Sequence, residues 1–169
     1  METSMSDCVI RPLAESEIPL LDDFLYEAIF VPDGAQAPSR AITQTPELQV
    51  YIKDFGTQRD DCCLVAEVGG RVVGAVWVRD MPDYGHVASG VPSFAVALLR
   101  EYRAKGIGTQ LMQAMLAELA KKRYTKASLS VQKANYAARW YQKLGFEIIG
   151  ENEEEYVMIY DFRRKSQTK

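Results

Sequence analysis

The apolar positions along the chain follow strand-like patterns in some segments and helix-like patterns in others. Short apolar runs at Cys8–Arg11, Cys62–Val68 and Arg71–Arg79 predict strands. The Gly69-Gly70 pair between the last two runs predicts the turn of a β-hairpin. The first half of the chain is therefore expected to contribute one short strand and one antiparallel hairpin.

Four segments are predicted to form helices. They are Ser16–Phe30, a segment from Pro46 to about Phe55 that Thr45 caps, Gly106–Arg123, and Ala134–Leu144, which Gly145 ends. The third has the clearest apolar stripe, at Ile107, Leu111, Met115 and Leu119. Side chains at this spacing lie on one face of a helix, so this helix is expected to bury one side.

The strands predicted in the second half complete a single sheet. Ser93–Leu99 is a nearly continuous apolar run, typical of a central strand covered on both faces. The remaining strands are Ala127–Val131 and an antiparallel pair, Phe146–Ile149 with Tyr156–Tyr160. The resulting order, β-α-α-β-β-β-α-β-α-β-β, predicts an α/β fold with one mixed sheet. Since no repeat or linker interrupts it, residues 1–169 are expected to form one domain, with a core over about residues 8–162.

Composition excludes several classes of protein. Hydrophobic residues make up 47% of the 169 residues and charged residues 25%, a balance that excludes an intrinsically disordered chain. No apolar run reaches the ~18 residues of a membrane-spanning helix, and the N-terminus lacks the pattern of a signal peptide. Three Cys and one His predict neither a disulfide framework nor a zinc site. We therefore expect a cytoplasmic protein with no membrane partner and no metal.

Charge is distributed unevenly between the two halves of the chain. Residues 1–90 carry 6 basic and 15 acidic side chains, a net charge of −9, and residues 91–169 carry 14 basic and 8 acidic ones, a net charge of +6. The second half is suited to a polyanion and the first half to a cation, although solvated helix faces explain the same pattern. Because the pI is about 5.3 and no nucleic-acid motif is present, nucleic acid is not an expected partner.

The segment Arg103–Thr109, between the apolar strand and the longest helix, predicts an anion site. Gly106 and Gly108 leave backbone N–H groups accessible at the helix start, where the helix dipole attracts negative charge. Arg103 and Lys105 add two positive charges. The segment fits neither a Walker A loop nor a dinucleotide fingerprint, whose third glycine is Leu111 here. It indicates a phosphate cradle, and a plain glycine-rich turn is the alternative.

The same residues resemble a known acyl-CoA-binding motif. Arg103-Ala104-Lys105-Gly106-Ile107-Gly108 is similar to the Gln/Arg-x-x-Gly-x-Gly/Ala motif of the GNAT N-acetyltransferase superfamily, with Ala104 where that family most often has Gly. Val96-Ala97-Leu98 resembles the family's splayed central strand. The helix from Ala137 through Tyr141 to Gly145-Phe146 resembles its second signature, and the element order matches over nearly the whole chain. The resemblance implies a GNAT-like fold with a splayed central strand.

This resemblance also implies a reaction and a set of residues. An amine would attack acetyl-CoA, the co-substrate, directly in a ternary complex, and backbone amides near Ala97 and Leu98 would polarise the thioester carbonyl. Tyr141 would protonate the CoA sulfur or donate a hydrogen bond to it, unless it is only a core aromatic. The implied cofactor-binding residues are Val96, Ala97, Leu98, Arg103, Ala104, Lys105, Gly106, Ile107, Gly108 and Thr109.

Two further residues have open roles. Asn135 lies six residues before Tyr141, where family members often have seven, so it is either a contact to the pantetheine arm or a helix N-cap. His86, the one histidine, is a candidate general base because an unperturbed imidazole titrates near neutral pH. Asp83, Tyr84 and a water chain are its rivals, and a structural histidine is the alternative. Cys62 and Cys63 are expected to fill the core.

The acceptor is expected to be a primary amine on a small molecule or on a protein. We expect it to enter between the loops Val31–Ala41 and Met81–Val91, because the first half of the chain carries the negative charge. A homodimer is compatible with the sequence. The rival class is a binding module, a non-catalytic acyl-CoA sensor of the same fold, which would keep the cradle and lack turnover.

Overall fold

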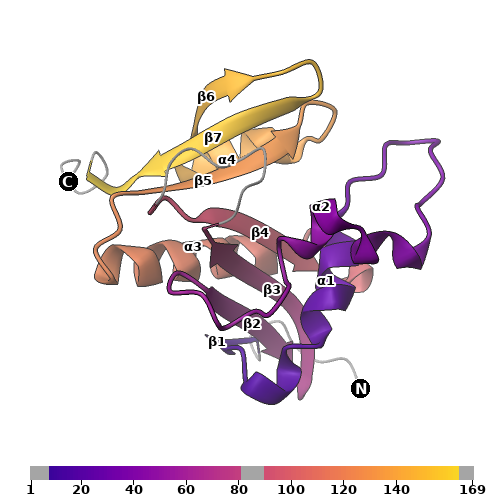
Figure 1. Ribbon diagram of the computed structural model, residues 1–169, viewed down its shortest axis with the longest axis horizontal. Coiled ribbons are helices and arrows are strands. Elements are labelled where there is room, and N and C mark those ends of the chain that lie inside the picture. The colour runs from indigo at the N-terminus through magenta and orange to yellow at the C-terminus, as the bar shows by residue number, and fades with distance from the viewer. Residues whose placement is uncertain (1–7, 81–89, 164–169) are drawn as a thin grey trace.

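One mixed sheet organises the computed structural model, which describes residues 8–80 and 90–163. In these ranges seven strands lie in the order β1-β2-β3-β4-β5-β7-β6 (Figure 1). Their bounds are β1 Val9–Pro12, β2 Cys62–Val68, β3 Arg71–Arg79, β4 Ser93–Leu98, β5 Lys126–Gln132, β6 Glu147–Glu151 and β7 Glu155–Asp161. The predicted α/β fold with a single mixed sheet is confirmed, and every predicted strand is present.

The sheet opens between β4 and β5. All other neighbouring strands pair antiparallel, whereas β4 and β5 run parallel and share the single register pair Ser93–Ser128. The two buried hydroxyls of this pair lie 3.1 Å apart and close the narrow end of the opening. Beyond it the ladder stops, so the predicted splay of the central strand is confirmed.

Helices cover both faces of the sheet (Figure 1). On one face, α3 (Ile107–Lys121) buries Ile107, Leu111, Met115 and Leu119 completely, as its stripe predicts. Each such side chain contributes about 1.5–3 kcal/mol by leaving water. The shorter α4 (Ala137–Leu144) packs against the same core cluster. The other face is covered by α1 (Leu20–Ala28), whose buried side chains pack with Trp77 of β3.

The helix expected from Pro46 to about Phe55 is much shorter. It begins as predicted, with Thr45 at the N-cap position, but α2 spans only Pro46–Gln49. The carbonyls of the next turn are taken by buried side chains instead of helical amides. Trp77 Nε1 donates to Tyr51 at 3.1 Å, and Arg79 donates to Val50 at 3.1 Å and to Lys53 at 2.8 Å. These tertiary hydrogen bonds override the local helix propensity, and the bond to its carbonyl fixes the backbone of Tyr51.

Three other boundaries differ from the sequence pattern. The helix expected over Ser16–Phe30 is interrupted at Pro19, which separates a 3-10 turn at Glu15–Glu17 from α1. The helix expected over Ala134–Leu144 begins at Ala137. The segment Met81–Ser89 lies outside the described residues, so the candidate base His86 cannot be placed, nor can Asp83 and Tyr84.

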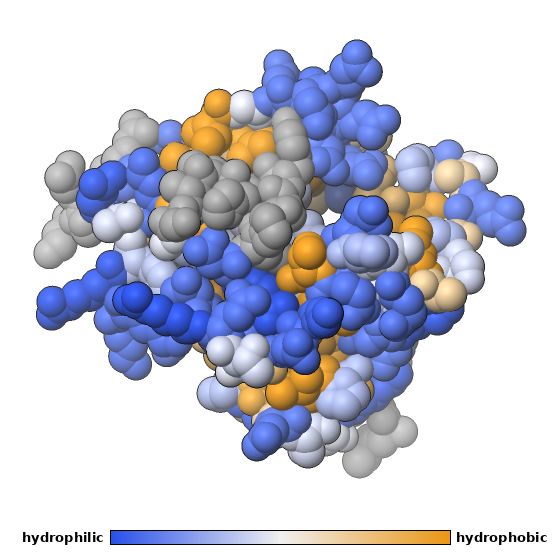
Figure 2. Space-filling view, viewed as in Figure 1, coloured by the Kyte–Doolittle hydropathy of each residue, from blue (hydrophilic) through white to orange (hydrophobic). Residues whose placement is uncertain are grey.

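The C-terminal hairpin brings an acidic turn to the open side of the sheet. Asn152 shapes this turn, because its side-chain oxygen accepts from the N–H groups of Glu154 and Glu155 at 2.8 and 2.7 Å. Figure 2 shows a hydrophilic surface over the turn, beside an apolar patch over the hairpin, where Ile148 and Ile149 are exposed. Glu155 begins β7 opposite Gln132 of β5, so its position is fixed by the sheet register.

None of the helices in the described part of the chain has both the length and the apolar character needed to cross a bilayer.

Candidate active site

Alternation along β4 decides which backbone amides face the opening. The N–H of Leu99 donates to Val73 in β3 at 2.9 Å, and Ala97 lies opposite Ala75 in the same ladder. Because successive N–H groups of a strand point to opposite sides, those of Val96 and Leu98 point away from β3, toward β5. They lie beyond the last β4–β5 pair, at Ser93. The sequence interpretation named the amides of Ala97 and Leu98. The Leu98 N–H faces the opening as that interpretation requires, whereas the Ala97 N–H belongs to the β3 ladder, and the Val96 N–H faces the opening instead.

The glycine cradle lies at the start of α3. Gly106 is the N-cap and adopts the left-handed region at φ 87°, a conformation that glycine takes without strain. The first helical hydrogen bond runs from Gln110 N–H to the Gly106 carbonyl at 3.2 Å, so the amides of Ile107, Gly108 and Thr109 precede it. Lys105 and Gly106 are exposed beside these amides. The predicted anion-binding geometry is therefore present in the backbone.

Individual residues of the cradle differ in what they offer a ligand. Ile107 is fully buried, so its side chain belongs to the core and is not available to a ligand. Ala104 has φ 60°, which explains why glycine suits this position better. Arg103 donates to the Leu98 carbonyl at 3.1 Å and forms a 3.0 Å ion pair with Glu27 of α1. The positive charge of Arg103 is therefore partly balanced by Glu27, a pairing that the sequence alone does not show.

Gly108 allows α4 to pack closely against the start of α3. A Cβ at this position would lie 3.4 Å from Leu98 Cδ1 and from two ring carbons of Trp140. The Trp140 Nε1–H donates to the hydroxyl of Thr109 at 2.9 Å, which fixes the indole over the cradle. The second glycine of the motif therefore serves packing between the two signature segments as well as backbone access.

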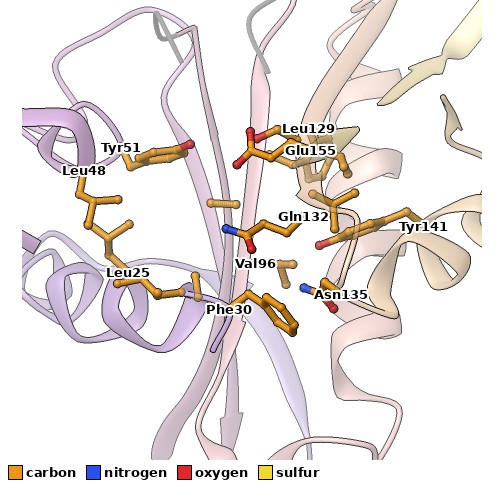
Figure 3. A pocket seen from close by; sticks show the side chains of 16 residues that line it. Leu25, Phe30, Leu48, Tyr51, Val96, Leu129, Gln132, Asn135, Tyr141 and Glu155 are labelled. Carbon is orange, nitrogen blue, oxygen red and sulfur yellow. The ribbon is translucent and has the colours of Figure 1, made fainter. Parts of the chain in front are cut away.

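Tyr141 lies next to Trp140 and points its hydroxyl into a cavity between β4 and β5 (Figure 3). Its ring packs against those of Trp140 and Phe146, with centroids 4.9 and 5.9 Å apart. Burial raises the pKa of the Tyr141 hydroxyl to about 12. The group is therefore protonated throughout the neutral range, as a hydrogen-bond donor to a leaving sulfur must be.

Two cavities meet beside Tyr141. The larger, of about 620 Å³, is bordered by the cradle residues Arg103 and Gly108 and by Leu98. The smaller, of about 260 Å³, extends toward Tyr51, Gln132 and Glu155. Tyr141, Val96, Asn135 and Phe30 line both. A ligand reaching from the cradle to Tyr141 would thus end where a second ligand can begin.

The loop that follows α1 borders the larger cavity. Val31, Ala37 and Pro38 line it together with the cradle residues, and Tyr26 donates a hydrogen bond to the Pro38 carbonyl at 2.5 Å. Because Arg103 and Gly108 line the same cavity, this loop can contact either ligand, and acceptor entry beside it stays a prediction.

Asn135 binds the start of α4 and also lines both cavities, and its contact with the pantetheine arm stays a prediction. Its side-chain oxygen accepts from the N–H of Ala137, the first residue of α4, at 2.9 Å, although the N-cap position itself is held by Tyr136. The same residue lines both cavities, with its amide group turned toward Tyr141 (Figure 3). Asn135 lies six residues before Tyr141, in the turn that precedes α4. In this turn the Asn135 N–H donates to the Gln132 carbonyl at 2.9 Å.

Sequence reasoning missed three polar residues of the smaller cavity. Tyr51, Gln132 and Glu155 come from the segment after α2, the end of β5 and the start of β7, and their polar ends point into the cavity (Figure 3). In the sequence, Glu155 lies in the acidic run between the two predicted C-terminal strands, and nothing there distinguishes it from its neighbours. Its pairing with Gln132 across the sheet is the signal that places it, and this requires knowing that β5 and β7 are neighbours.

The cysteines and metal-type clusters add nothing to this site. Cys63 is buried in the core, and burial raises the pKa of its thiol, which makes it a poor nucleophile. Within residues 8–80 and 90–163, no three His, Cys, Asp or Glu side chains gather closely enough to hold a metal ion.

Comparisons with known proteins agree with this geometry. The Acetyltransferase (GNAT) family model matches residues 29–146, from the end of α1 to the Gly-Phe signature. No curated protein matches the chain significantly by sequence. Solved structures resemble it in fold.

Three of these structures illustrate the likeness. The PaiA N-acetyltransferase of Thermoplasma acidophilum in complex with coenzyme A is 18% identical, covers 91% of this chain and 98% of its own, and has a TM-score of 0.67. A GNAT-family acetyltransferase of Streptococcus pneumoniae is 18% identical, covers 91% of this chain and 99% of its own, and has a TM-score of 0.65. The spermidine/spermine N-acetyltransferase SpeG of Vibrio cholerae is 15% identical, covers 97% of this chain and 98% of its own, and has a TM-score of 0.66.

The family model spans more than half of the chain and includes the splayed strand, the cradle and Tyr141. The protein therefore belongs to the GNAT family of acetyltransferases, enzymes that transfer an acyl group from acyl-CoA.

Proposed function

We propose that the protein transfers the acetyl group of acetyl-CoA to a primary amine by direct attack in a ternary complex. One observation carries this proposal: the two cavities meet at Tyr141 and Val96, between the cradle and the polar group of Glu155, Gln132 and Tyr51. The arrangement lets two ligands touch without a protein nucleophile between them.

The chain's own groups fit the cofactor from one end to the other. Lys105 and the amides that precede the first helical hydrogen bond of α3 suit the pyrophosphate, and the amides of Val96 and Leu98 suit the thioester oxygen. Acetyl-CoA supplies an activated thioester. As negative charge develops on the thioester oxygen during attack, the Val96 and Leu98 amides stabilise it, as in an oxyanion hole.

The step balances without a further reactant. The neutral amine nitrogen attacks the thioester carbon, a C–N bond forms and the C–S bond breaks. The ammonium form of the amine first loses one proton, and the attacking nitrogen loses a second as the amide forms. One of these protons ends on the departing sulfur. The net products are the amide, the CoA thiol and one proton.

Tyr141 acts on the sulfur mainly as a hydrogen-bond donor. With a pKa of about 12, its hydroxyl is a weaker acid than an ordinary thiol, whose pKa is about 8.5. Complete proton transfer from Tyr141 to a thiolate is therefore uphill unless the same buried site also raises the pKa of the thiol. The hydroxyl stabilises the departing charge, and the final proton arrives with the products.

The test measures CoA-thiol release from acetyl-CoA with a panel of primary amines, beside the shift in melting temperature that acetyl-CoA causes without an amine. A cofactor at 100 times its Kd adds about 2.7 kcal/mol of apparent stability. We expect both stabilisation and amine-dependent release. Stabilisation with no release for any amine would overturn the proposal and favour the non-catalytic acyl-CoA sensor.

A further inference from the structure

The smaller cavity has an uneven lining. Its wall toward α1 and α2 is apolar, formed by Leu25, Phe30 and Leu48, and Val96 and Leu129 extend the apolar surface across the sheet. Opposite this wall, Glu155 is the one acidic side chain among the described lining residues. Figure 3 shows its carboxylate pointing into the space between Tyr51 and Gln132. The described lining thus sets one carboxylate, among polar groups such as Gln132 and Tyr51, opposite an apolar wall.

The geometry holds Glu155 in place at the edge of this volume. Its N–H donates to Asn152 at 2.7 Å, and its backbone pairs with Gln132 in the β5–β7 ladder. The neighbouring base Lys133 forms a 2.8 Å ion pair with Glu151, on the adjacent strand β6. Tyr51 is fixed from the opposite side by the bond from Trp77 to its carbonyl at 3.1 Å. Glu155 and Tyr51 therefore come from separate parts of the fold, each held by its own backbone hydrogen bond.

We propose that this cavity binds the acceptor as a compact monoamine with an apolar body, and that Glu155 receives its ammonium group and takes the proton that must leave before attack. The inference rests on the proposed function, since it names the acceptor of that same reaction. A cavity of about 260 Å³ lies at the small end of ligand sites, so the body is the size of a short branched alkyl group or a single ring.

The lining also argues against a polycation. In a diamine or polyamine, a second ammonium several bonds away would lie against Leu25, Leu48 or Phe30, where the described lining offers no second carboxylate. Burying an unpaired ammonium among apolar side chains is strongly unfavourable. The apolar body of a monoamine gains contact with the same wall. Selectivity for monoamines therefore follows from the position of a single charge.

The experiment compares phenethylamine and isopentylamine with spermidine and with a lysine-containing peptide, all at saturating acetyl-CoA. We expect kcat/KM for the apolar monoamines to exceed that for spermidine and the peptide at least tenfold. A preference for spermidine or the peptide would overturn the inference and leave the proposed function standing. If none of the four amines causes release of CoA thiol, both the inference and the proposed function fail.

Glu155→Gln tests the role of the carboxylate, with Glu153→Gln as the matched control. Glu153 lies in the same turn and is exposed, so its replacement removes the same charge outside the cavity. We expect Glu155→Gln to lower kcat/KM for phenethylamine about 100-fold and to leave the Kd for CoA unchanged. Its residual kcat/KM should rise with pH toward the pKa of the amine, because only the free base reacts. Equal effects of the two variants would overturn the inference.

Discussion

The two cavities beside Tyr141 differ in the groups that form them: one is formed mainly by backbone and the other by side chains. The cofactor side is mostly backbone: two outward amides of β4, the glycine-capped start of α3, and a glycine that lets Trp140 approach. The acceptor side consists of side chains from separate parts of the chain, including Tyr51, Gln132 and Glu155. The first is encoded in a short contiguous segment, and the second exists only after the sheet has formed.

This difference has a functional consequence. A backbone site tolerates many side chains as long as its conformation is kept, so one cradle can serve a family whose members share a CoA substrate. A side-chain site changes with single substitutions, so acceptor choice can vary while the fold stays the same. Variants on the two sides should therefore separate cleanly in binding and kinetics.

The largest effect is expected at the junction of the cavities. Tyr141→Phe removes only the hydroxyl that points into the cavity and that we propose acts on the sulfur, so kcat should fall by about 10²–10⁴ while the Kd for CoA is unchanged. Rapid measurement of thiol release and calorimetry of CoA binding check the two quantities. Tyr136→Phe, at a tyrosine that is 86% exposed, is the control and should behave like the wild type. An undiminished kcat in Tyr141→Phe would reduce this residue to packing.

The next effect concerns the cofactor side alone. At Gly108 a Cβ already lies 3.4 Å from Leu98 and Trp140, so Gly108→Trp should displace the indole and cover the amides of α3. We expect CoA affinity to fall about 100-fold or more in calorimetry, a loss of about 2.7 kcal/mol. Gln110→Trp places the same side chain at an exposed position of the same helix and should bind CoA normally. Unchanged affinity in a folded Gly108→Trp protein would place the cofactor elsewhere.

The raised pKa of Tyr141 predicts a pH dependence of stability. An unfolded tyrosine titrates near pH 10, whereas Tyr141 in the fold titrates near 12. The folded state therefore retains the proton more tightly, and the resulting stability is fully present below pH 10 and is lost as pH rises toward 12. Its size is about 1–3 kcal/mol.

Urea unfolding of the wild type and of Tyr141→Phe at pH 8 and pH 11.5 isolates this contribution, because the other tyrosines are common to both proteins. We expect the wild type to lose more free energy of unfolding between the two pH values. Equal losses would show that burial of this hydroxyl does not shift its titration.

Asn135 lines both cavities, and we expect its replacement to act mainly by lowering the free energy of unfolding. Asn135→Ala removes the acceptor for the Ala137 N–H, which should lower the free energy of unfolding by about 1 kcal/mol. Asn135→Asp keeps a cap oxygen and should restore most of that stability. If the alanine variant unfolds like the wild type while CoA binding weakens, the residue is a cofactor contact and its cap bond is incidental.

The smallest effect tests the strain in the cradle. Ala104 has φ 60°, so Ala104→Gly should raise the free energy of unfolding by about 0.5–1 kcal/mol, with CoA affinity unchanged. Ala117→Gly, on an exposed helical position of α3, should lower it by about 1 kcal/mol. Destabilisation by both substitutions would contradict the left-handed conformation at position 104.

The sequence predicted the cofactor side because its signals are local. The strand at Ser93, the glycines at 106 and 108 and the stripe of α3 lie within a single stretch of chain, and the structure reproduces them. The sequence did not reveal the partners of Ala97 and Arg103, because both partners lie far away in the chain. Ala97 is paired with Ala75 in β3, and Arg103 with Glu27 in α1.

The acceptor side could not be predicted in the same way. Tyr51 is placed by bonds from Trp77 and Arg79 that end α2 early, and local propensity favours a longer helix there. Glu155 faces the cavity because β7 lies beside β5, an order that the hydrophobic pattern does not encode. The sequence pointed instead to His86, which lies outside the described residues. Long-range register, and not residue type, determined these positions.

The central claim is direct transfer of an acetyl group to an amine with no acylated protein on the way. Intact-mass spectrometry after mixing the protein with acetyl-CoA, with and without phenethylamine, tests it most directly when CoA thiol is counted in the same samples. The account predicts an unchanged protein mass in both samples and N-acetylphenethylamine formed in equal amount to the thiol. A protein heavier by one acetyl group that reverts when amine is added, or thiol release without an N-acetyl product, would contradict it.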